Sequence, residues 1–292
     1  MTEHLWHAAA AGFEAACSIP LLPDGHRSRQ LHGHSFLAKI RALDEIGIDD
    51  LAILFDDTRG DVPDLAAREA EIVHTALDAT RASRVVMCPT YYSDDRMLDV
   101  VFGERPAGYL DELGRRLDPR VGVYWTGEEI CAREFGVGHL ERVAGSLRRK
   151  PTLWDNYPVN DGPQMSRFLH LRGFTGRPRA IGSHIAAHAI NPALQPHLSL
   201  IPAATLAASY LQGPAYAYMN AFREAARTLA GADLAAMLEE DLHALQDRGI
   251  DRLGDERLRL RERYLAVNHP MSGEVVRWLD RADTVDAWVE EV

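Results

Sequence analysis

The chain has 292 residues, of which 46% are hydrophobic, enough to bury the core of one large domain or two modest ones. Its net charge is −11 and the acidic residues are spread along the sequence, which argues against a nucleic-acid-binding protein. Three scattered cysteines argue against a disulfide framework, and we recognise neither a signal peptide nor a stretch long enough to span a bilayer. We therefore expect a cytoplasmic protein without a membrane partner.

The first 41 residues contain two segments that the sequence predicts as strands. Residues 13–16 and 35–41 flank a turn-rich stretch at 22–26, so we expect them to pair as an N-terminal β-hairpin.

Short apolar runs alternate with amphipathic segments between residues 42 and 202. The runs predict strands at 51–55, 84–88, 121–125 and 152–154, with a weaker one near 179–184. The segments between them predict helices at 64–80, 106–117, 127–133 and 137–147. This alternation is typical of a parallel sheet covered by helices.

The sequence becomes helical in character beyond residue 202. Apolar spacing and Gly or Pro punctuation predict helices at 203–211, 215–230, 233–247, 254–266 and 273–291. We expect these helices to form an appendage that packs on the sheet domain.

Two adjacent acids, Asp56 and Asp57, follow the first apolar run after residue 42. In α/β folds the carboxyl ends of parallel strands carry the chemistry, although an Asp can also cap the next helix. Polar and aromatic residues follow the later runs as well, at 88–92, 125–127, 154–161 and 191–192. Acids, amides and aromatic rings that converge at one sheet edge suit a sugar, whose hydroxyls and apolar faces they can bind.

These motifs resemble those of glycoside hydrolase family 84, which includes O-GlcNAcase and bacterial β-N-acetylglucosaminidases. The matching stretches are Ile-Leu-Phe-Asp-Asp at 53–57, Met-Cys-Pro-Thr-Tyr-Tyr at 87–92, Tyr-Trp-Thr-Gly at 124–127 and Trp-Asp-Asn-Tyr-Pro-Val-Asn-Asp at 154–161, with Asn-Pro at 191–192. The resemblance implies an incomplete (β/α)8 TIM-barrel-like sheet at 42–230, followed by a C-terminal helical region at 231–292.

The resemblance also implies a function, retaining hydrolysis of β-N-acetylglucosaminides in which the 2-acetamido group of the substrate is the nucleophile. Asp56 would polarise that acetamido group, and Asp57 would be the general acid and then the base. The implied partner is an N-acetylglucosamine-containing glycoconjugate, no cofactor is implied, and a homo-oligomer is left open. The implied substrate-binding residues are Tyr92, Thr126, Ile130, Trp154, Asn156, Asp161 and Asn191.

The chain departs from the family pattern upstream of the acid pair. The family's Gly-Phe-Tyr-Gly and Lys-Asp-Asp motifs and roughly three βα units are not found there, which would leave an exposed edge strand and could impair activity. A non-catalytic remnant that binds N-acetylglucosamine is therefore an alternative.

The segment 1–41 has a resemblance of its own. Phe-Glu-Ala-Ala-Cys at 13–17 and Leu-His-Gly-His-Ser-Phe at 31–36 resemble the start of the 6-pyruvoyl- and 6-carboxytetrahydropterin synthase family, in which histidines of a hairpin bind zinc. His32 and His34 match two of these ligands and Cys17 occupies the position of the third, so zinc binding is a further alternative. An exposed His-Gly-His turn without metal is the other interpretation.

Overall fold

The computed structural model describes residues 14–18, 26–56 and 58–285, and for residues 14–18 and 26–34 it describes only the backbone. The chain divides into two compact units. The first comprises Met1–Trp154 and Gly182–Ala189, and the second comprises Asp155–Ile181 and Ile190–Val292. The family boundaries after residues 41 and 230 are a different kind of division and stay a prediction.

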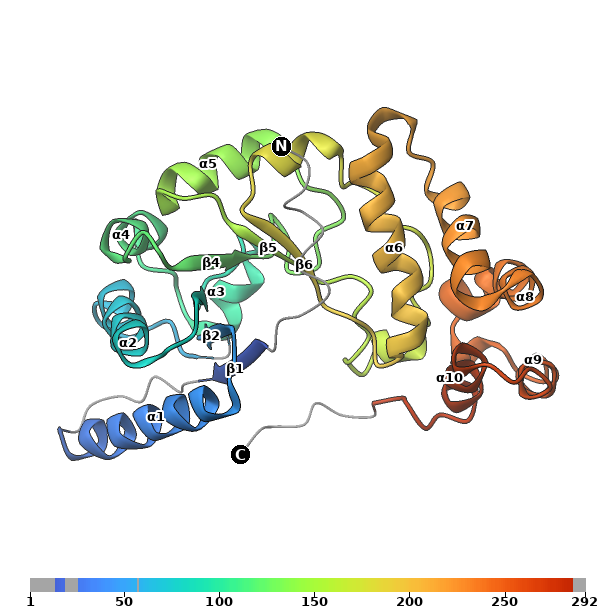
Figure 1. The fold of residues 1–292 in the computed structure, drawn as a ribbon, viewed down its shortest axis with the longest axis horizontal. Helices are drawn as coiled ribbons and strands as arrows, with labels where there is room; N and C mark the ends of the chain where they lie inside the picture. Colours follow the sequence, from blue (N-terminus) through green and yellow to red (C-terminus); the bar gives the residue numbers. More distant parts are fainter. Residues whose placement is uncertain (1–13, 19–25, 57, 286–292) are drawn as a thin grey trace. The chain divides into compact units, whose positions relative to one another are not determined.

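Six strands form one sheet whose spatial order follows the chain, from β1 to β6 (Figure 1). The strands are β1 (Glu14–Ser18), β2 (Asp50–Leu54), β3 (Arg84–Cys88), β4 (Gly122–Trp125), β5 (Thr152–Asp155) and β6 (Ala187–Ile190). Neighbouring strands from β1 to β5 pair in parallel. In the described part of the chain this sheet is open, because β1 and β6 stand at opposite ends of the strand order.

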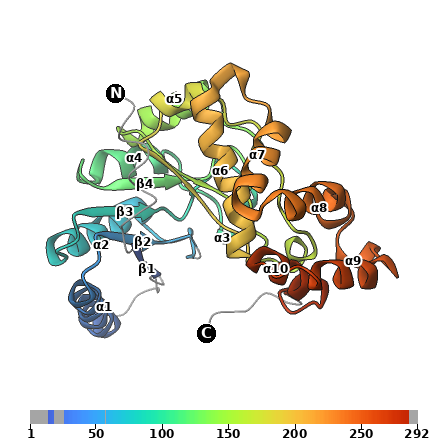
Figure 2. The same ribbon diagram turned by 45° about the vertical axis from the view of Figure 1, so that its right-hand side comes forward.

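The longer helices of the first unit pack on one face of the sheet, and a shorter one lies apart from them (Figures 1 and 2). The helices are α1 (His26–Ile46), α2 (Leu65–Ala79), α3 (Met97–Phe102), α4 (Tyr109–Arg116) and α5 (Val137–Leu147). Strand β2 shows why, since Leu51 and Ile53 alternate with Ala52 and Leu54. The first pair is fully buried in the core under the helices, and the second pair belongs to a smaller apolar cluster.

The predicted N-terminal β-hairpin is wrong. Residues 35–41 lie in helix α1, and β1 pairs with β2 in parallel, with Ala16 opposite Ala52. The apolar residues explain the error, because Phe36, Ile40 and Leu43 recur at helical spacing and pack on the core. The alternation within 35–41 imitated a strand only locally.

The second unit is built from α-helices that surround an apolar core of their own. Tyr264 and Trp278 are fully buried in it, and the Trp278 indole N–H donates to the Ser166 carbonyl at 2.9 Å. The α-helices are α6 (Pro196–Gln212), α7 (Tyr218–Ala230), α8 (Ala232–Leu242), α9 (Glu256–Leu265) and α10 (Pro270–Leu279). Shorter turns are η2 (Met165–Arg167), η4 (Gly213–Ala215), the π-helical η5 (His243–Arg248) and η6 (Ile250–Arg252).

Two further predictions differ from the structure. The weak strand near 179–184 is the 3-10 turn η3 (Arg179–Ser183), and the sixth strand comes afterwards. Residues 127–133 form turns and bends instead of a helix. None of the described helices is both long and apolar enough to cross a bilayer.

Candidate active site

The sequence-predicted site residues of the first unit follow successive strands at the carboxyl edge of the sheet. Asp56 comes two residues after β2, Tyr92 four residues after β3, and Thr126 directly after β4. Since β2, β3 and β4 are parallel neighbours, this order brings their carboxyl ends together.

Asp56 is half-buried where β2 ends, and its partner in the acid pair, Asp57, lies outside the described residues. The Phe55 N–H donates to the Cys88 carbonyl at 2.9 Å, so the main chain is still tied to β3 as it reaches Asp56. Thr58, which follows the pair, is buried. Its N–H and its hydroxyl both donate to the Phe55 carbonyl, at 3.2 and 2.7 Å. Phe55 and Thr58, the residues on either side of the acid pair in the sequence, are thus joined to each other by hydrogen bonds.

A buried carboxyl group on helix α2 contacts Thr58 through Thr90 and so supports these hydrogen bonds. Glu69 is fully buried, and its Oε1 lies 2.7 Å from Thr90 Oγ1 and 3.1 Å from the Thr90 N–H. The Tyr109 hydroxyl donates to Glu69 Oε2, and the Thr90 hydroxyl also lies 2.7 Å from that of Thr58. Burial raises the pKa of Glu69 to about 7, although the hydrogen bonds from Tyr109 and Thr90 oppose that shift.

Tyr91 restrains the loop after β2 at Gly60. Its hydroxyl donates to the Gly103 carbonyl at 2.6 Å, and the Gly60 N–H donates to the Phe102 carbonyl at 2.7 Å. A Cβ atom on Gly60 would lie 2.0 Å from the Tyr91 hydroxyl oxygen, so only glycine fits there. The Arg105 guanidinium lies 4.8 Å from the centroid of the Tyr91 ring.

Hydrogen bonds that each involve at least one main-chain group hold the loops after β3 and β4 together. The Thr126 N–H donates to the Tyr92 carbonyl at 2.9 Å, and the Ser93 hydroxyl donates to the Gly127 carbonyl at 2.9 Å. The Ile130 N–H donates to Asp95 Oδ2 at 3.2 Å. Tyr92, Thr126 and Ile130 are therefore placed by one connected pair of loops.

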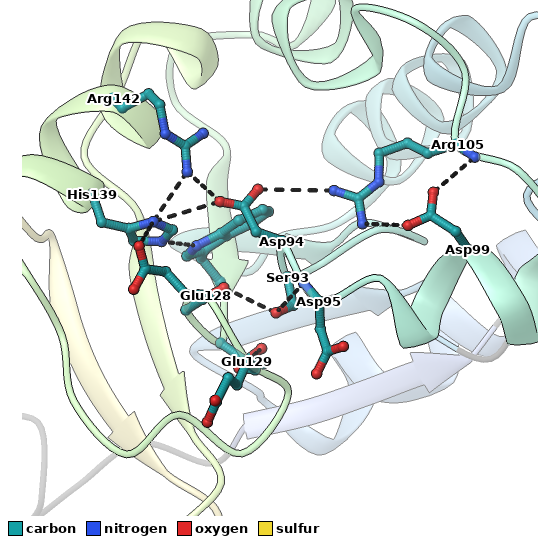
Figure 3. Close-up of polar contacts among 12 residues, drawn as sticks. Ser93, Asp94, Asp95, Asp99, Arg105, Glu128, Glu129, His139 and Arg142 are labelled. Atoms are coloured by element: carbon teal, nitrogen blue, oxygen red, sulfur yellow. Dashed lines mark hydrogen bonds and ion pairs between the residues drawn. The ribbon is translucent and has the colours of Figure 1, made fainter.

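A charged cluster fastens these two loops to helix α5 (Figure 3). Asp94 contacts Arg142 on one side and Arg105 on the other, the latter at 3.9 Å. His139 Nδ1 lies 3.5 Å from carboxylate oxygens of both Asp94 and Glu128. The Asp94 carboxylate thus joins the loop after β3 to α5, which makes the cluster a support for the candidate site.

The His139 ring is fixed in one tautomer by its second nitrogen. The Trp125 indole N–H can only donate, and it reaches His139 Nε2 at 3.0 Å. Nε2 therefore accepts, and the hydrogen of a neutral His139 lies on Nδ1, toward the carboxylates. Burial lowers the pKa of His139 below its usual value, against the opposing effect of Asp94.

The two aromatic residues predicted to form the sugar pocket share an apolar cluster. Tyr92 and Trp154 pack, half-buried, on buried residues that include Val86 and Tyr124. The rings of Tyr124 and Trp154 meet edge to face with centroids 5.0 Å apart. This cluster lies on the face of the strands opposite the helix-covered core, as the interior of a barrel-like sheet requires.

The remaining predicted residues belong to the second unit. The Asn191 N–H donates to the Asp155 carbonyl at 2.9 Å, and the Asn191 side-chain amide donates to Asn156 Oδ1 at 3.1 Å. Asp161 is exposed, whereas its neighbour Asn160 is fully buried. The structure thus brings Asn156 and Asn191 together, while Asp161 lies exposed to solvent.

The predicted zinc site loses its geometric basis. His32 and His34 lie in helix α1, where residues two apart are separated by about 200° around the axis and do not share a face. The side chains of Cys17, His32 and His34 are outside the described part of the chain. Among the side chains that the structure describes, no group of three or more His, Cys, Asp or Glu could hold a metal ion.

Sequence reasoning missed Glu69 and the Asp94–His139 cluster. Glu69 does leave a signal, because it stands four residues from both Leu65 and Val73, on the apolar face of α2. An acid at such a position must be buried or must turn to solvent. His139 stands beside Leu140 with no comparable pattern, and its partner Trp125 is fourteen residues away.

Comparison with known proteins identifies the family. The family model for beta-N-acetylglucosaminidase matches residues 24–246. Protein O-GlcNAcase from Rattus norvegicus and that from Mus musculus are each 26% identical over 184 residues, 59% of this chain. The chain spans only about a fifth of the length of these curated relatives, 19% of each.

Solved structures agree with this family. A mutant of the Thermobaculum terrenum O-GlcNAc hydrolase is similar with a TM-score of 0.71 and 26% identity, over 92% of this chain and 65% of that one. CpGH84B, at 18% identity, shows the shared fold with a TM-score of 0.67 over 93% of this chain and 54% of its own. The predicted α/β fold of an incomplete TIM-barrel-like sheet is confirmed. The chain belongs to the beta-N-acetylglucosaminidase family, glycoside hydrolase family 84.

Proposed function

We propose that this protein is a retaining β-N-acetylglucosaminidase that hydrolyses an N-acetylglucosamine-containing glycoconjugate. Family membership supports the reaction class, and the parallel order of β2, β3 and β4 supports the shared location of the residues that follow them. That parallel order carries the proposal, because it brings Asp56, Tyr92 and Thr126 to one edge of the sheet.

The proposed roles follow from the chemistry of the side chains. Asp56 polarises the 2-acetamido group, whose oxygen attacks the anomeric carbon while the bond to the leaving oxygen breaks. Asp57 gives its proton to that leaving oxygen and later takes a proton from the attacking water. Opposite protonation states are needed at the start, so the two acids require different surroundings.

Binding is assigned to the aromatic and amide groups. Tyr92 and Trp154 would cover apolar faces of the sugar, and the amides of Asn156 and Asn191 would bind its polar groups. Thr126, Ile130 and Asp161 complete the proposed set.

Zinc is not part of this proposal, because positions 32 and 34 lie in helix α1 and not on a strand, where they would share a face. We also propose a reducing, cytoplasmic location, which the small number of scattered cysteines in the sequence supports.

A fluorogenic aryl N-acetyl-β-glucosaminide tests the proposal. Asp57→Asn is expected to lower kcat by about 10²–10⁴-fold, the range of general acid–base catalysis. Asp111→Asn on the exposed face of α4 is the matched control and should leave kcat unchanged. Turnover that survives Asp57→Asn would remove the proposed acid, and calorimetric binding of N-acetylglucosamine without turnover would favour the non-catalytic alternative.

The nucleophile can be tested separately. Fluorine on the N-acyl group withdraws electrons from its oxygen, so an N-fluoroacetyl substrate should react more slowly than the N-acetyl one when that oxygen attacks. Equal rates for both substrates would contradict the substrate-assisted mechanism.

A further inference from the structure

Four short oxygen–oxygen contacts connect the buried carboxyl group of Glu69 to its surroundings. Glu69 Oε1 lies 2.7 Å from Thr90 Oγ1, which lies 2.7 Å from Thr58 Oγ1. Thr58 Oγ1 lies 2.7 Å from the Phe55 carbonyl oxygen, and the Tyr109 hydroxyl contacts Glu69 Oε2. Three of these contacts form a continuous path from Glu69 to the backbone at the end of β2.

The hydrogens available to this path decide the protonation state of Glu69. A carbonyl oxygen only accepts, so the hydrogen between Thr58 and Phe55 belongs to the Thr58 hydroxyl. The hydrogen between the two threonine hydroxyls must then come from Thr90. Each hydroxyl has one hydrogen, so the hydrogen between Thr90 and Glu69 comes from the carboxyl group. The hydroxyl oxygen of that carboxyl can still accept the Thr90 N–H at 3.1 Å.

An ionised Glu69 reverses the path. Thr90 then donates to the carboxylate, Thr58 donates to Thr90, and no hydrogen remains between Thr58 and the Phe55 carbonyl. Two oxygens 2.7 Å apart without a hydrogen repel each other, so this contact should open.

The contact that opens is next to the acid pair in the sequence. Phe55 precedes Asp56 and Thr58 follows Asp57. The Thr58 N–H donates to the same carbonyl at a longer 3.2 Å, so the hydroxyl contact is the shorter of the two links across the pair.

The two tyrosines that face Glu69 from neighbouring elements are uncharged at neutral pH. Tyr109 comes from α4 and Tyr91 from the loop after β3, and burial, more than the charge of Glu69, raises the pKa of both. Cys88 at the end of β3 is buried beside Tyr109. The charged pair Asp99 and Arg105 acts on Tyr91. Burial alone therefore dominates at Glu69, and raises its pKa to about 7.

We infer that Glu69 is a positioning residue whose protonated carboxyl group, acting through Thr90 and Thr58, fixes the main chain on both sides of Asp56 and Asp57. This inference rests on the proposed function for its catalytic meaning. Its structural part, the coupling of one buried proton to Thr58, stands independently.

NMR of the intact chain tests the coupling without any substrate. The Glu69 carboxyl carbon should titrate with a midpoint near pH 7, and the Thr58 amide should shift with the same midpoint. In Glu69→Gln the Thr58 amide should not titrate, because the neutral amide oxygen accepts from Thr90 at every pH. Glu71→Gln, on the exposed side of the same helix, is the control and should retain the titration. A Thr58 amide that titrates equally in Glu69→Gln would overturn the inference.

A second variant avoids any change at Glu69. Thr58→Val removes the hydroxyl in the middle of the path, so the Glu69 carboxyl should still titrate while the shift of the residue 58 amide disappears. Thr58→Ser restores a hydroxyl and should restore the shift. A valine variant that keeps the shift would show that the hydroxyl path does not carry it.

Kinetics then connect the coupling to the reaction. On the acidic side of pH 7, Glu69→Gln should lower kcat/KM by about tenfold, within the cost of misplacing a catalytic group. The part of the fall of kcat/KM near pH 7 that comes from Glu69 should disappear in this variant and persist in Glu71→Gln, whereas a fall that comes from ionisation of Asp57 should remain in both. An unchanged profile in Glu69→Gln would contradict the positioning role. Absence of turnover in the unmodified protein would instead refute the proposed function, and the NMR titration would still decide the coupling.

Discussion

Asp155 and Arg177 form a bidentate ion pair inside the second unit. The Arg177 Nε donates to Asp155 Oδ2 at 2.8 Å and its NH2 group donates to Oδ1 at 2.6 Å. The Asp155 side chain is 0% exposed and that of Arg177 is 5% exposed. Asp155 stands between Trp154 and Asn156 in the sequence, and its carbonyl accepts the Asn191 N–H at 2.9 Å. The pair therefore anchors the segment that carries proposed substrate-binding residues.

Removing one partner of this pair should destabilise the protein strongly. Arg177→Met leaves a buried carboxylate without its cation, and we expect a loss of about 3–5 kcal/mol in the free energy of unfolding, measured by denaturant titration. The matched control is Arg261→Met, whose partner Asp280 is largely solvated, with side-chain exposures of 35% and 41%. That change should cost much less than Arg177→Met. Equal costs for both variants would show that the buried pair is not special.

Gly60 should not tolerate a side chain. In Gly60→Ala the new Cβ atom would meet the Tyr91 hydroxyl oxygen at 2.0 Å, and that ring is held by its bond to the Gly103 carbonyl. We expect a destabilisation of about 1–3 kcal/mol, again from denaturant titration. Gly145→Ala in helix α5 is the control, because its Cβ would meet no atom within 4 Å. The control should stabilise the protein by about 0.5–1 kcal/mol.

The tautomer of His139 can be read directly from its ring nitrogens. Nitrogen NMR should show the hydrogen on Nδ1, since Nε2 accepts from the Trp125 indole. Protonation of Nε2 would place its hydrogen against the hydrogen of the Trp125 indole N–H, which disfavours the charged ring. Trp125→Phe removes this repulsion, so it should raise the pKa of His139 by roughly one unit or less. A hydrogen on Nε2 in the unmodified protein would contradict this arrangement. The Arg142 Nη2 atom also lies 3.0 Å from Nδ1. Both nitrogens carry hydrogens and cannot bond to each other, so the Asp94 carboxylate, which contacts both, bridges them.

Glu69 should make the stability of the protein depend on pH. Its pKa is raised from 4.5 to about 7 in the folded state, so the folded state retains a proton that the unfolded state releases. The contribution of Glu69 to the free energy of unfolding should therefore be complete below about pH 4.5 and should be lost as pH rises through 7. The total loss should be about 3 kcal/mol. Glu69→Gln should remove this fall, as urea titrations at several pH values can test. A variant that retains the full slope would assign it to other groups.

The parts of the fold that depend on local pattern were predictable from the sequence. Strand β3 occupies the predicted residues 84–88, because its run of apolar residues is buried on both faces of the sheet. Helix α5 likewise matches 137–147. Strand β6 was missed because Ala187–Ile190 is only half-buried and contains a single β-branched residue.

The site was predictable in its residue types and less so in its supports. Tyr92 and Trp154 do share an apolar cluster, and Asn156 and Asn191 do share a hydrogen bond. The role of Asp57 stays a prediction. Glu69 depends on partners 21 and 40 residues further along the chain, and no local pattern reveals such pairings.

Strand β1 occupies the sheet position beside β2, in a segment whose letters resemble an unrelated enzyme. A parallel ladder is made from main-chain amides and carbonyls, which are alike in every residue except proline. The pairing of β1 with β2 therefore does not depend on the side chains that carry the second resemblance, and the segment extends the sheet by one strand whatever those side chains bind.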